Sequence, residues 1–227
     1  MAEAFDVIFQ DEHIIVINKK AKIVVQPTPK GEKHTLTSLL AGEVKTKVFP
    51  CHRLDRETTG VIVYAKTRQI QQKIMDQFRR GAIKKKYIAF IRGFLPKASG
   101  VFSSCIIDKQ GRRFHEKKKA AKTNYAVLEQ LNSFSVVELT PLTGRTNQLR
   151  IHLAERGNPI LGETVYAYRR DFKVKFKRLA LHAFSLRFTH PAINKTFTFT
   201  TKLPEDMRVF LEKHDLAKSK IKDQNAK

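Results

Sequence analysis

The stretch that most constrains this chain is a polar loop that leads directly into a run of apolar, β-forming residues. The loop, CHRLDRETTG, spans residues 51–60, and the apolar run, VIVYA, spans residues 61–65. Short runs rich in valine and isoleucine are typical of buried strands, so we expect this loop to be attached to a core strand. Loops held by a rigid scaffold carry much of enzyme chemistry. The alternative, a surface loop with ordinary ion pairs, is what the local composition alone favours.

Within this loop, Asp55 lies between Arg53 and Arg56. Nearby positive charge favours the ionised form of a carboxyl group, and an ionised carboxylate in a partly dry site is a competent nucleophile or general base. Arg150, much further along the chain, could supply a planar, bidentate partner for it. A phosphate contact or a structural ion pair is an equally good interpretation of Arg150.

The charge of the chain points to a polyanionic partner. It has 44 Lys and Arg against 21 Asp and Glu, a formal net charge of +23, and that much like charge destabilises a compact fold by self-repulsion. Nucleic acid is the leading interpretation, and an anionic membrane surface or plain solubility are the alternatives. Although charge runs are usually solvated faces, basic runs beside aromatic residues also suit a phosphate backbone with a stacked base. The candidates for backbone contacts are Lys84, Lys85, Lys86, Arg112, Arg113, Lys117 and Lys118.

Several site classes have no support in the sequence. The two cysteines and eight histidines lack the spacing of a disulfide framework or a metal site. Phosphate-binding glycine motifs and the GxSxG nucleophile elbow are absent, so we expect no metal and no cofactor. No apolar run approaches the roughly 18 residues that span a bilayer, and the first residues are acidic where a signal peptide is basic. We therefore expect a cytoplasmic protein that does not bind membranes.

The periodicity along the chain predicts many short strands and few helices. Helices are expected at 35–47 and 67–80, at about 147–156 with Thr146 or Asn147 as the N-cap, and from Pro204 onward. The expected strands lie at 5–9, 14–17, 84–90, 125–129, 134–140, 179–189 and 196–200, with a basic hairpin at 100–122. This pattern predicts one α+β domain over residues 1–213, built on a mixed, mostly antiparallel sheet flanked by helices. Residues 214–227 would form a basic, disordered tail.

Five segments together resemble the RluA-type pseudouridine synthases. HRLDRETTG is similar to that family's HRLDxxTSG signature, and GRTNQLRIHLAERGNPILGE is similar to its GRTHQLRxHxxxxGxPIxGD segment. KKKYIAFIRG resembles KxYxAxVxG, LALHAFSLRFTHP resembles a third conserved segment, and FDVIFQDEHIIVINKKAKIVVQP resembles the usual opening. These segments follow the family's order over most of the chain.

The resemblance implies the pseudouridine synthase fold and an isomerase that converts uridine to pseudouridine in ribosomal RNA, transfer RNA or both, without cofactor or metal. Asp55 would be the essential aspartate, acting as nucleophile or as base. Tyr87 would stack on the target base and help remove the C5 proton, Arg150 would pair with the aspartate, and Leu181 would pack on the base. Plain core packing is the alternative for Tyr87 and Leu181. The other candidate substrate-binding residues are His52, Arg53, Arg56, Arg145 and Gln148, of which His52 and Arg53 would alternatively only shape the loop.

The chain departs from the family pattern at three places. NKKAK replaces NKPAG, Asn147 stands where histidine is usual, and Thr59 stands where serine is usual. We expect a compact, monomeric member without a separate N-terminal RNA-binding domain. The rival hypothesis is a non-catalytic RNA-binding or ribosome-assembly protein on the same fold. A nuclease would require paired carboxylates or two histidines in one motif, which the sequence lacks.

Overall fold

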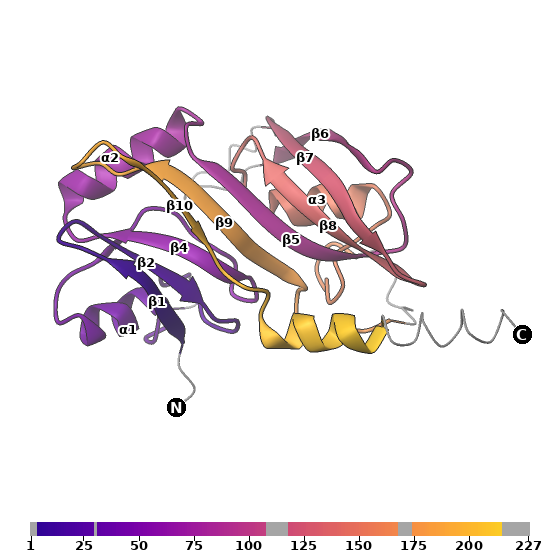
Figure 1. Ribbon diagram of the computed structural model, residues 1–227, viewed down its shortest axis with the longest axis horizontal. Helices are drawn as coiled ribbons and strands as arrows, with labels where there is room; N and C mark the ends of the chain where they lie inside the picture. Colours follow the sequence, from indigo (N-terminus) through magenta and orange to yellow (C-terminus); the bar gives the residue numbers. More distant parts are fainter. Residues whose placement is uncertain (1–3, 30, 108–117, 168–173, 215–227) are drawn as a thin grey trace, which may run out of the picture. The chain divides into compact units, whose positions relative to one another are not determined.

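A computed structural model of the chain is shown in Figure 1. It describes residues 4–29, 31–107, 118–167 and 174–214. The chain divides into two compact units, and the boundaries fall inside two of its strands. Unit 1 comprises residues 1–87 and 182–202, and unit 2 comprises residues 88–181 and 203–227. That residues 1–213 act as one domain stays a prediction.

Unit 1 contains a mixed set of strands. In the order β1-β2-β4-β9, each strand is hydrogen-bonded to the next, while β10 pairs with β9 and β3 pairs with β4. The pair β4–β9 is parallel and the other four pairs are antiparallel. The strands are β1 (Phe5–Gln10), β2 (Ile14–Lys19), β3 (Phe49–Pro50), β4 (Thr59–Ala65), β9 (Leu181–Thr189) and β10 (Thr196–Thr200).

The central strands of unit 1 are buried on both faces because a helix covers each face. Helix α1 (Leu36–Glu43) packs on one face of the sheet and α2 (Arg68–Arg79) packs on the other. Side chains alternate between the two faces of a strand, and this divides the core in two. The α1-side cluster includes Ile15, Ile17, Leu36, Leu40, Ile62 and Tyr64. The α2-side cluster includes Ile14, Val16, Val61, Val63, Ile70 and Ile74.

Unit 2 carries the strand order β5-β8-β7-β6. The strands are β5 (Lys84–Arg92), β6 (Ser99–Ile107), β7 (Lys118–Gln130) and β8 (Phe134–Pro141). Helix α3 (Gln148–Glu155) packs against β6. Residues 205–214 form a further helix, yellow in Figure 1. Its Phe210 packs against Phe90, Phe134 and Phe176, which fixes the helix to the core of this unit.

The mixed, mostly antiparallel sheet and the helices beside it confirm the predicted fold class. Helix α2 also begins and ends where expected, because the Thr67 side chain accepts a hydrogen bond from the Ile70 N–H and Arg80 is the C-cap. Helix α1 is shorter than predicted. It stops at Glu43, since Lys45 takes a left-handed conformation with φ 52°. No helix in the described part of the chain is long and apolar enough to cross a membrane.

Gly60 is required where the loop enters β4. Its φ is 114°, and a Cβ atom at this position would lie 2.2 Å from the Ala183 carbonyl oxygen of the parallel neighbour β9. We expect Gly60→Ala to lower the free energy of unfolding by about 3 kcal/mol, through overpacking and backbone strain. Chemical denaturation would measure this loss. The matched control is Gly42→Ala in α1, where nothing lies within 4 Å of the added Cβ and alanine favours the helix. Equal stability of the two variants would contradict the packing argument.

Candidate active site

The Asp55 loop is fixed to unit 1 by its apolar residue and by a turn. Leu54 is buried in the α1-side cluster, whereas Asp55, the next residue, is half-buried. The Thr58 N–H donates to the Asp55 carbonyl oxygen at 3.1 Å and closes a four-residue turn. Aspartate is favoured at the first position of such turns. The loop therefore holds the Asp55 side chain at the edge of the core.

The buried side chain of Lys19 holds this turn in place through hydrogen bonds. The Lys19 side chain lies at the end of β2 and is fully buried. Its ammonium donates to the carbonyl oxygens of Lys20, Arg56 and Thr58 at 2.9, 3.0 and 2.8 Å. A buried charge is tolerated only when it is well paired, so these contacts constrain the backbone on both sides of Glu57. Sequence reasoning missed Lys19; a lysine at the end of a largely apolar strand was the available signal.

His52 anchors the start of the loop to β4. Its Nε2 accepts a hydrogen bond from the Val63 N–H at 3.2 Å, and its ring lies 5.0 Å from the ring of Phe78. Burial, and then the charge of Lys85, lowers the pKa of His52 to about 3, so the imidazole is neutral. Of the two interpretations of His52, these contacts favour the one in which it shapes the loop.

The hydroxyl at Thr59 serves a buried contact. Its Oγ1 lies 2.8 Å from His182 Nδ1, and His182 Nε2 lies 2.9 Å from Thr201 Oγ1. A serine would also supply this hydroxyl, which accounts for the tolerance of threonine where the family usually has serine. His182 was not singled out from the sequence.

Tyr87 shares the electrostatic environment of Asp55. The tyrosine packs against the α1-side cluster. Burial raises the pKa of the Tyr87 phenol, and the negative charge of Asp55 raises it further. The free protein therefore holds a neutral phenol beside a carboxylate. Such a phenol suits aromatic stacking and hydrogen-bond donation better than the role of a base.

In unit 2, Arg150 is held by a bidentate ion pair with Glu163. Its Nε and Nη2 donate to the Glu163 carboxylate at 2.7 and 2.8 Å, and the Glu163 side chain is fully buried. Burial alone would raise the pKa of Glu163. Hydrogen bonds from Arg150 and from the Val165 and Tyr166 N–H groups outweigh burial and keep this pKa below its ordinary value. The structural ion pair left open for Arg150 thus exists, and its predicted pairing with Asp55 of unit 1 stays a prediction.

Asn147 completes the arrangement around Arg150. Its Oδ1 accepts from Arg150 Nη1 at 3.1 Å, and its Nδ2 donates to the Tyr166 hydroxyl at 2.9 Å. The Arg150 guanidinium lies 5.1 Å from the centre of the Tyr166 ring. The prediction that the Asn147 side chain caps α3 is wrong in one respect: Asn147 occupies the N-cap position with a left-handed φ of 55°, but its side chain makes no capping hydrogen bond.

Three further candidates lie in buried or half-buried positions of unit 2. Leu181 is 4% exposed at the start of β9. The buried Gln148 amide accepts from Thr143 Oγ1 and the Arg145 N–H and donates to the Lys122 carbonyl and Thr123 Oγ1. Arg145 donates to the Ala120 carbonyl at 3.3 Å. Gln148 already has protein partners at both ends of its amide, and the substrate contacts expected of all three residues stay predictions.

The basic candidates differ in exposure. On β5, Lys84 and Lys86 are exposed, whereas the Lys85 ammonium lies 5.6 Å from the centre of the Phe78 ring and burial lowers its pKa. Strand alternation explains this difference, and it makes Lys85 the least suited of the three for a phosphate. Arg53 and Arg56 in the loop, and Lys118 on β7, are exposed. Arg112, Arg113 and Lys117 lie outside the described residues.

The chemistry available to this site is that of a carboxylate. Asp55 is half-buried in a locked loop, and a neutral phenol lies within the reach of its charge. Among the described residues, no group of three or more His, Cys, Asp and Glu side chains is arranged to hold a metal ion. A nucleophile or a base, together with an aromatic platform, is what these residues supply.

Comparison with known proteins places this site in a family. The family model described as RNA pseudouridylate synthase matches residues 13–155, which include Asp55 and Tyr87. The chain belongs to the RNA pseudouridylate synthase family. It is 36% identical over 206 residues to the dual-specificity RNA pseudouridine synthase RluA of Haemophilus influenzae, covering 87% of this chain and 92% of the relative. The predicted resemblance to RluA-type enzymes is thereby confirmed.

Other similar proteins differ in length. The ribosomal large subunit pseudouridine synthase D of Nitrosomonas europaea is 34% identical over 222 residues, which cover 91% of this chain but only 64% of that relative. The tRNA pseudouridine synthase C of Haemophilus ducreyi is 31% identical, with 90% and 93% covered. Among solved structures, human RNA pseudouridylate synthase domain containing 4 has a TM-score of 0.73 at 28% identity, over 88% of this chain and 89% of that one.

The Lys19 contacts predict a selective loss of stability. Lys19→Met removes a buried donor and leaves carbonyl oxygens of the Asp55 loop without it, so we expect a loss of about 3 kcal/mol in the free energy of unfolding. We also expect faster hydrogen exchange at the Thr58 N–H, measured by NMR. The control is Lys20→Met, which removes an exposed pair with Asp6 and should cost less than about 1 kcal/mol. Unchanged exchange at Thr58 in Lys19→Met would disprove the lock.

The half-buried, neutral His52 predicts a pH dependence of stability. Its pKa rises from about 3 in the folded protein to the ordinary value of 6.5 on unfolding. The unfolded chain therefore binds the extra proton as the pH falls below 6.5, and stability is lost in that direction. We expect the free energy of unfolding to fall less steeply between pH 6.5 and about 4 in His52→Gln than in the unsubstituted chain. His34→Gln, at an exposed histidine, should retain the full slope, and a full slope in His52→Gln would contradict the assignment.

Proposed function

We propose that this chain isomerises uridine to pseudouridine in RNA, with Asp55 as the residue on which the reaction depends. The observation that carries this proposal is the locked loop. Lys19 and the turn at Thr58 hold a half-buried carboxylate whose charge raises the pKa of a half-buried tyrosine. Membership of the RNA pseudouridylate synthase family supports the same reaction.

The reaction exchanges one bond of the ribose for another. The bond between ribose C1′ and uracil N1 breaks, a bond between C1′ and C5 forms, the proton on C5 leaves, and N1 gains a proton. No redox partner is required. Attack by Asp55 on the ribose, attack on the base and abstraction of a ribose proton all use the ionised carboxylate.

The proposal assigns positioning to the neighbouring side chains. Tyr87 would stack on the target uracil, and Leu181 would pack against the base. Arg150 would pair with Asp55, and its ion pair with Glu163 would orient its guanidinium. In view of its raised pKa, Tyr87 would contact the base as a neutral phenol, and the proton-removing role expected for it stays a prediction.

The substrate must bring its base out of the RNA stack before the glycosidic bond can be reached, at a cost of a few kcal/mol. A net charge of +23 and the exposed lysines and arginines beside the site would offset this cost through phosphate contacts. Relatives named for ribosomal RNA and for transfer RNA support both as substrate classes. We further propose that residues 1–213 act as one catalytic domain, and that the protein is a cytoplasmic monomer.

Substitution of Asp55 tests the proposal. We expect Asp55→Ala to form no pseudouridine in RNA from cells that lack this protein, while its affinity for that RNA stays within about tenfold, roughly 1.4 kcal/mol. Pseudouridine is measured by mass spectrometry of RNA digests, and binding by filter retention. Asp76→Ala, which removes an exposed carboxylate from α2, is the matched control and should retain activity. Pseudouridine formation by Asp55→Ala would refute the assignment of Asp55.

The same assays distinguish the rival function. A non-catalytic RNA-binding protein would retain salt-sensitive binding and form no pseudouridine even with Asp55 intact. Mapping pseudouridine in ribosomal and transfer RNA from cells with and without the protein would then identify the modified uridines.

A further inference from the structure

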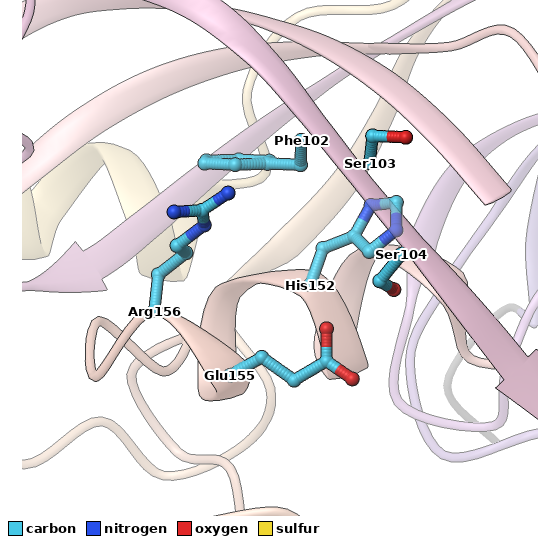
Figure 2. A pocket seen from close by; sticks show the side chains of 6 residues that line it. All are labelled: Phe102, Ser103, Ser104, His152, Glu155 and Arg156. Carbon is cyan, nitrogen blue, oxygen red and sulfur yellow. The ribbon is translucent and has the colours of Figure 1, made fainter.

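Unit 2 contains a small pocket built by residues that the proposed reaction does not use. The cavity has a volume of about 170 Å³, and its walls come from β6 and from α3 with its C-cap. At roughly 30 Å³ for each water in the liquid, it has room for about five waters. Figure 2 shows its lining side chains: Phe102, Ser103, Ser104, His152, Glu155 and Arg156.

Two polar groups in this pocket lack a hydrogen-bond partner among the described residues. They are the Nε2 of His152 and the hydroxyl oxygen of Ser104, both buried atoms. His152 as a whole is only 1% exposed. Figure 2 shows its imidazole beside Ser104. An unpaired buried polar group costs about 1–3 kcal/mol, so a molecule that hydrogen-bonds to both groups would stabilise this part of unit 2.

The hydrogen bonds behind His152 determine what its Nε2 offers. Gln148 Oε1 accepts from the Arg145 N–H, so Gln148 Nε2 is the end that donates to Thr123 Oγ1. Thr123 Oγ1 lies 3.0 Å from His152 Nδ1, and the described residues offer the Thr123 hydroxyl proton no other acceptor. That proton therefore points to Nδ1. Burial lowers the pKa of His152, which keeps the ring neutral and leaves its proton on Nε2, as a donor.

The rim of the pocket carries both signs of charge. The Arg156 guanidinium lies 5.9 Å from the centre of the Phe102 ring, and Figure 2 shows it beneath that ring. Glu155, the residue before Arg156, carries a carboxylate. Both Glu155 and Arg156 are exposed. Phe102 itself stacks on Tyr125 at 4.5 Å, which fixes a flat apolar wall. The pocket thus offers donors, an acceptor, an adaptable hydroxyl and an aromatic wall.

We propose that this pocket binds an unpaired nucleobase of the substrate RNA, at a second site distinct from the Asp55 loop. A base edge presents donors and acceptors side by side, and its faces stack on aromatic rings and guanidinium planes. His152 Nε2 and Arg156 would donate to the acceptors of the base, and Glu155 would accept from its donor. The Ser104 hydroxyl would either donate a hydrogen bond to the base or accept one from it.

A phosphate suits the same pocket less well. It presents only acceptors, so the Glu155 carboxylate would have no donor to accept from and would repel it. Phe102 would contribute nothing to its binding. The two ligands therefore predict opposite effects for removal of the Glu155 charge.

The inference rests on the proposed function for its RNA partner, and its test uses binding rather than turnover. The probes are single-stranded RNA oligonucleotides of equal length. Three are composed of adenosine, cytidine or uridine residues, and a fourth contains guanosine. A further probe is an abasic oligonucleotide with the same backbone. Affinities are measured by fluorescence anisotropy for the full chain, for Glu155→Ala and for Arg156→Ala. Glu205→Ala, at an exposed carboxylate of unit 2 outside the pocket, is the matched control. Both Glu155 and Arg156 are exposed, so their substitution spares the core.

For a base pocket, we expect Glu155→Ala and Arg156→Ala each to weaken binding of at least one base-containing probe by about fivefold, the effect of one lost hydrogen bond. The abasic probe should bind both variants equally well, and the ¹⁵N resonance of His152 Nε2 should shift only with the base-containing probe. Tighter binding of both probes by Glu155→Ala would identify a phosphate site and overturn the inference. Binding equal to that of Glu205→Ala would overturn it as well. Base-dependent binding without any pseudouridine formation would refute only the proposed reaction.

Discussion

The structure of the candidate site depends on the buried ammonium of Lys19. Three carbonyl oxygens stabilise this buried charge, and two of them belong to the Asp55 loop. Lys19 pairs with Gly60 across β2 and β4, and Gly60 pairs with Ala183 across β4 and β9. One row of paired residues thus fixes the loop. It consists of the charged Lys19, of Gly60, which has no side chain, and of Ala183 on the parallel strand β9. These backbone contacts hold the loop that carries Asp55.

Away from this loop, the buried carboxylate of Glu163 is paired, whereas several lysine side chains are exposed. The Arg150 guanidinium and two backbone N–H groups compensate the charge of Glu163. The bidentate ion pair fixes the orientation of both the Arg150 and the Glu163 side chains. On β5, neighbouring lysines have opposite environments: Lys85 covers Phe78, whereas Lys84 and Lys86 face solvent. The positive charge of the chain therefore divides into a structural part and a part available to RNA.

Much of this could be predicted from the sequence where the signal was local. The apolar run after the loop predicted β4, and the helical periodicity over residues 67–80 predicted α2, each nearly to the residue. The misses have identifiable causes. Lys45 ends α1 through its left-handed backbone conformation. The Asn147 side chain contacts Arg150 and Tyr166 and does not cap α3. Gln148 belongs to the segment that resembles the family, yet its amide is already bonded to Lys122, Thr123, Thr143 and Arg145.

By itself the sequence determined the fold class, the family and the choice of Asp55 as the central residue, because these depend on periodicity and on motifs read in order. Only the tertiary structure decided which partners the polar side chains take. Lys19 meets its carbonyl partners across as many as 39 residues of chain, and Thr59 meets His182 across 123. The Thr123–His152 contact that leaves His152 Nε2 as a donor joins β7 to α3. Such contacts follow from the packing of strands and helices, which no local pattern of residue types specifies.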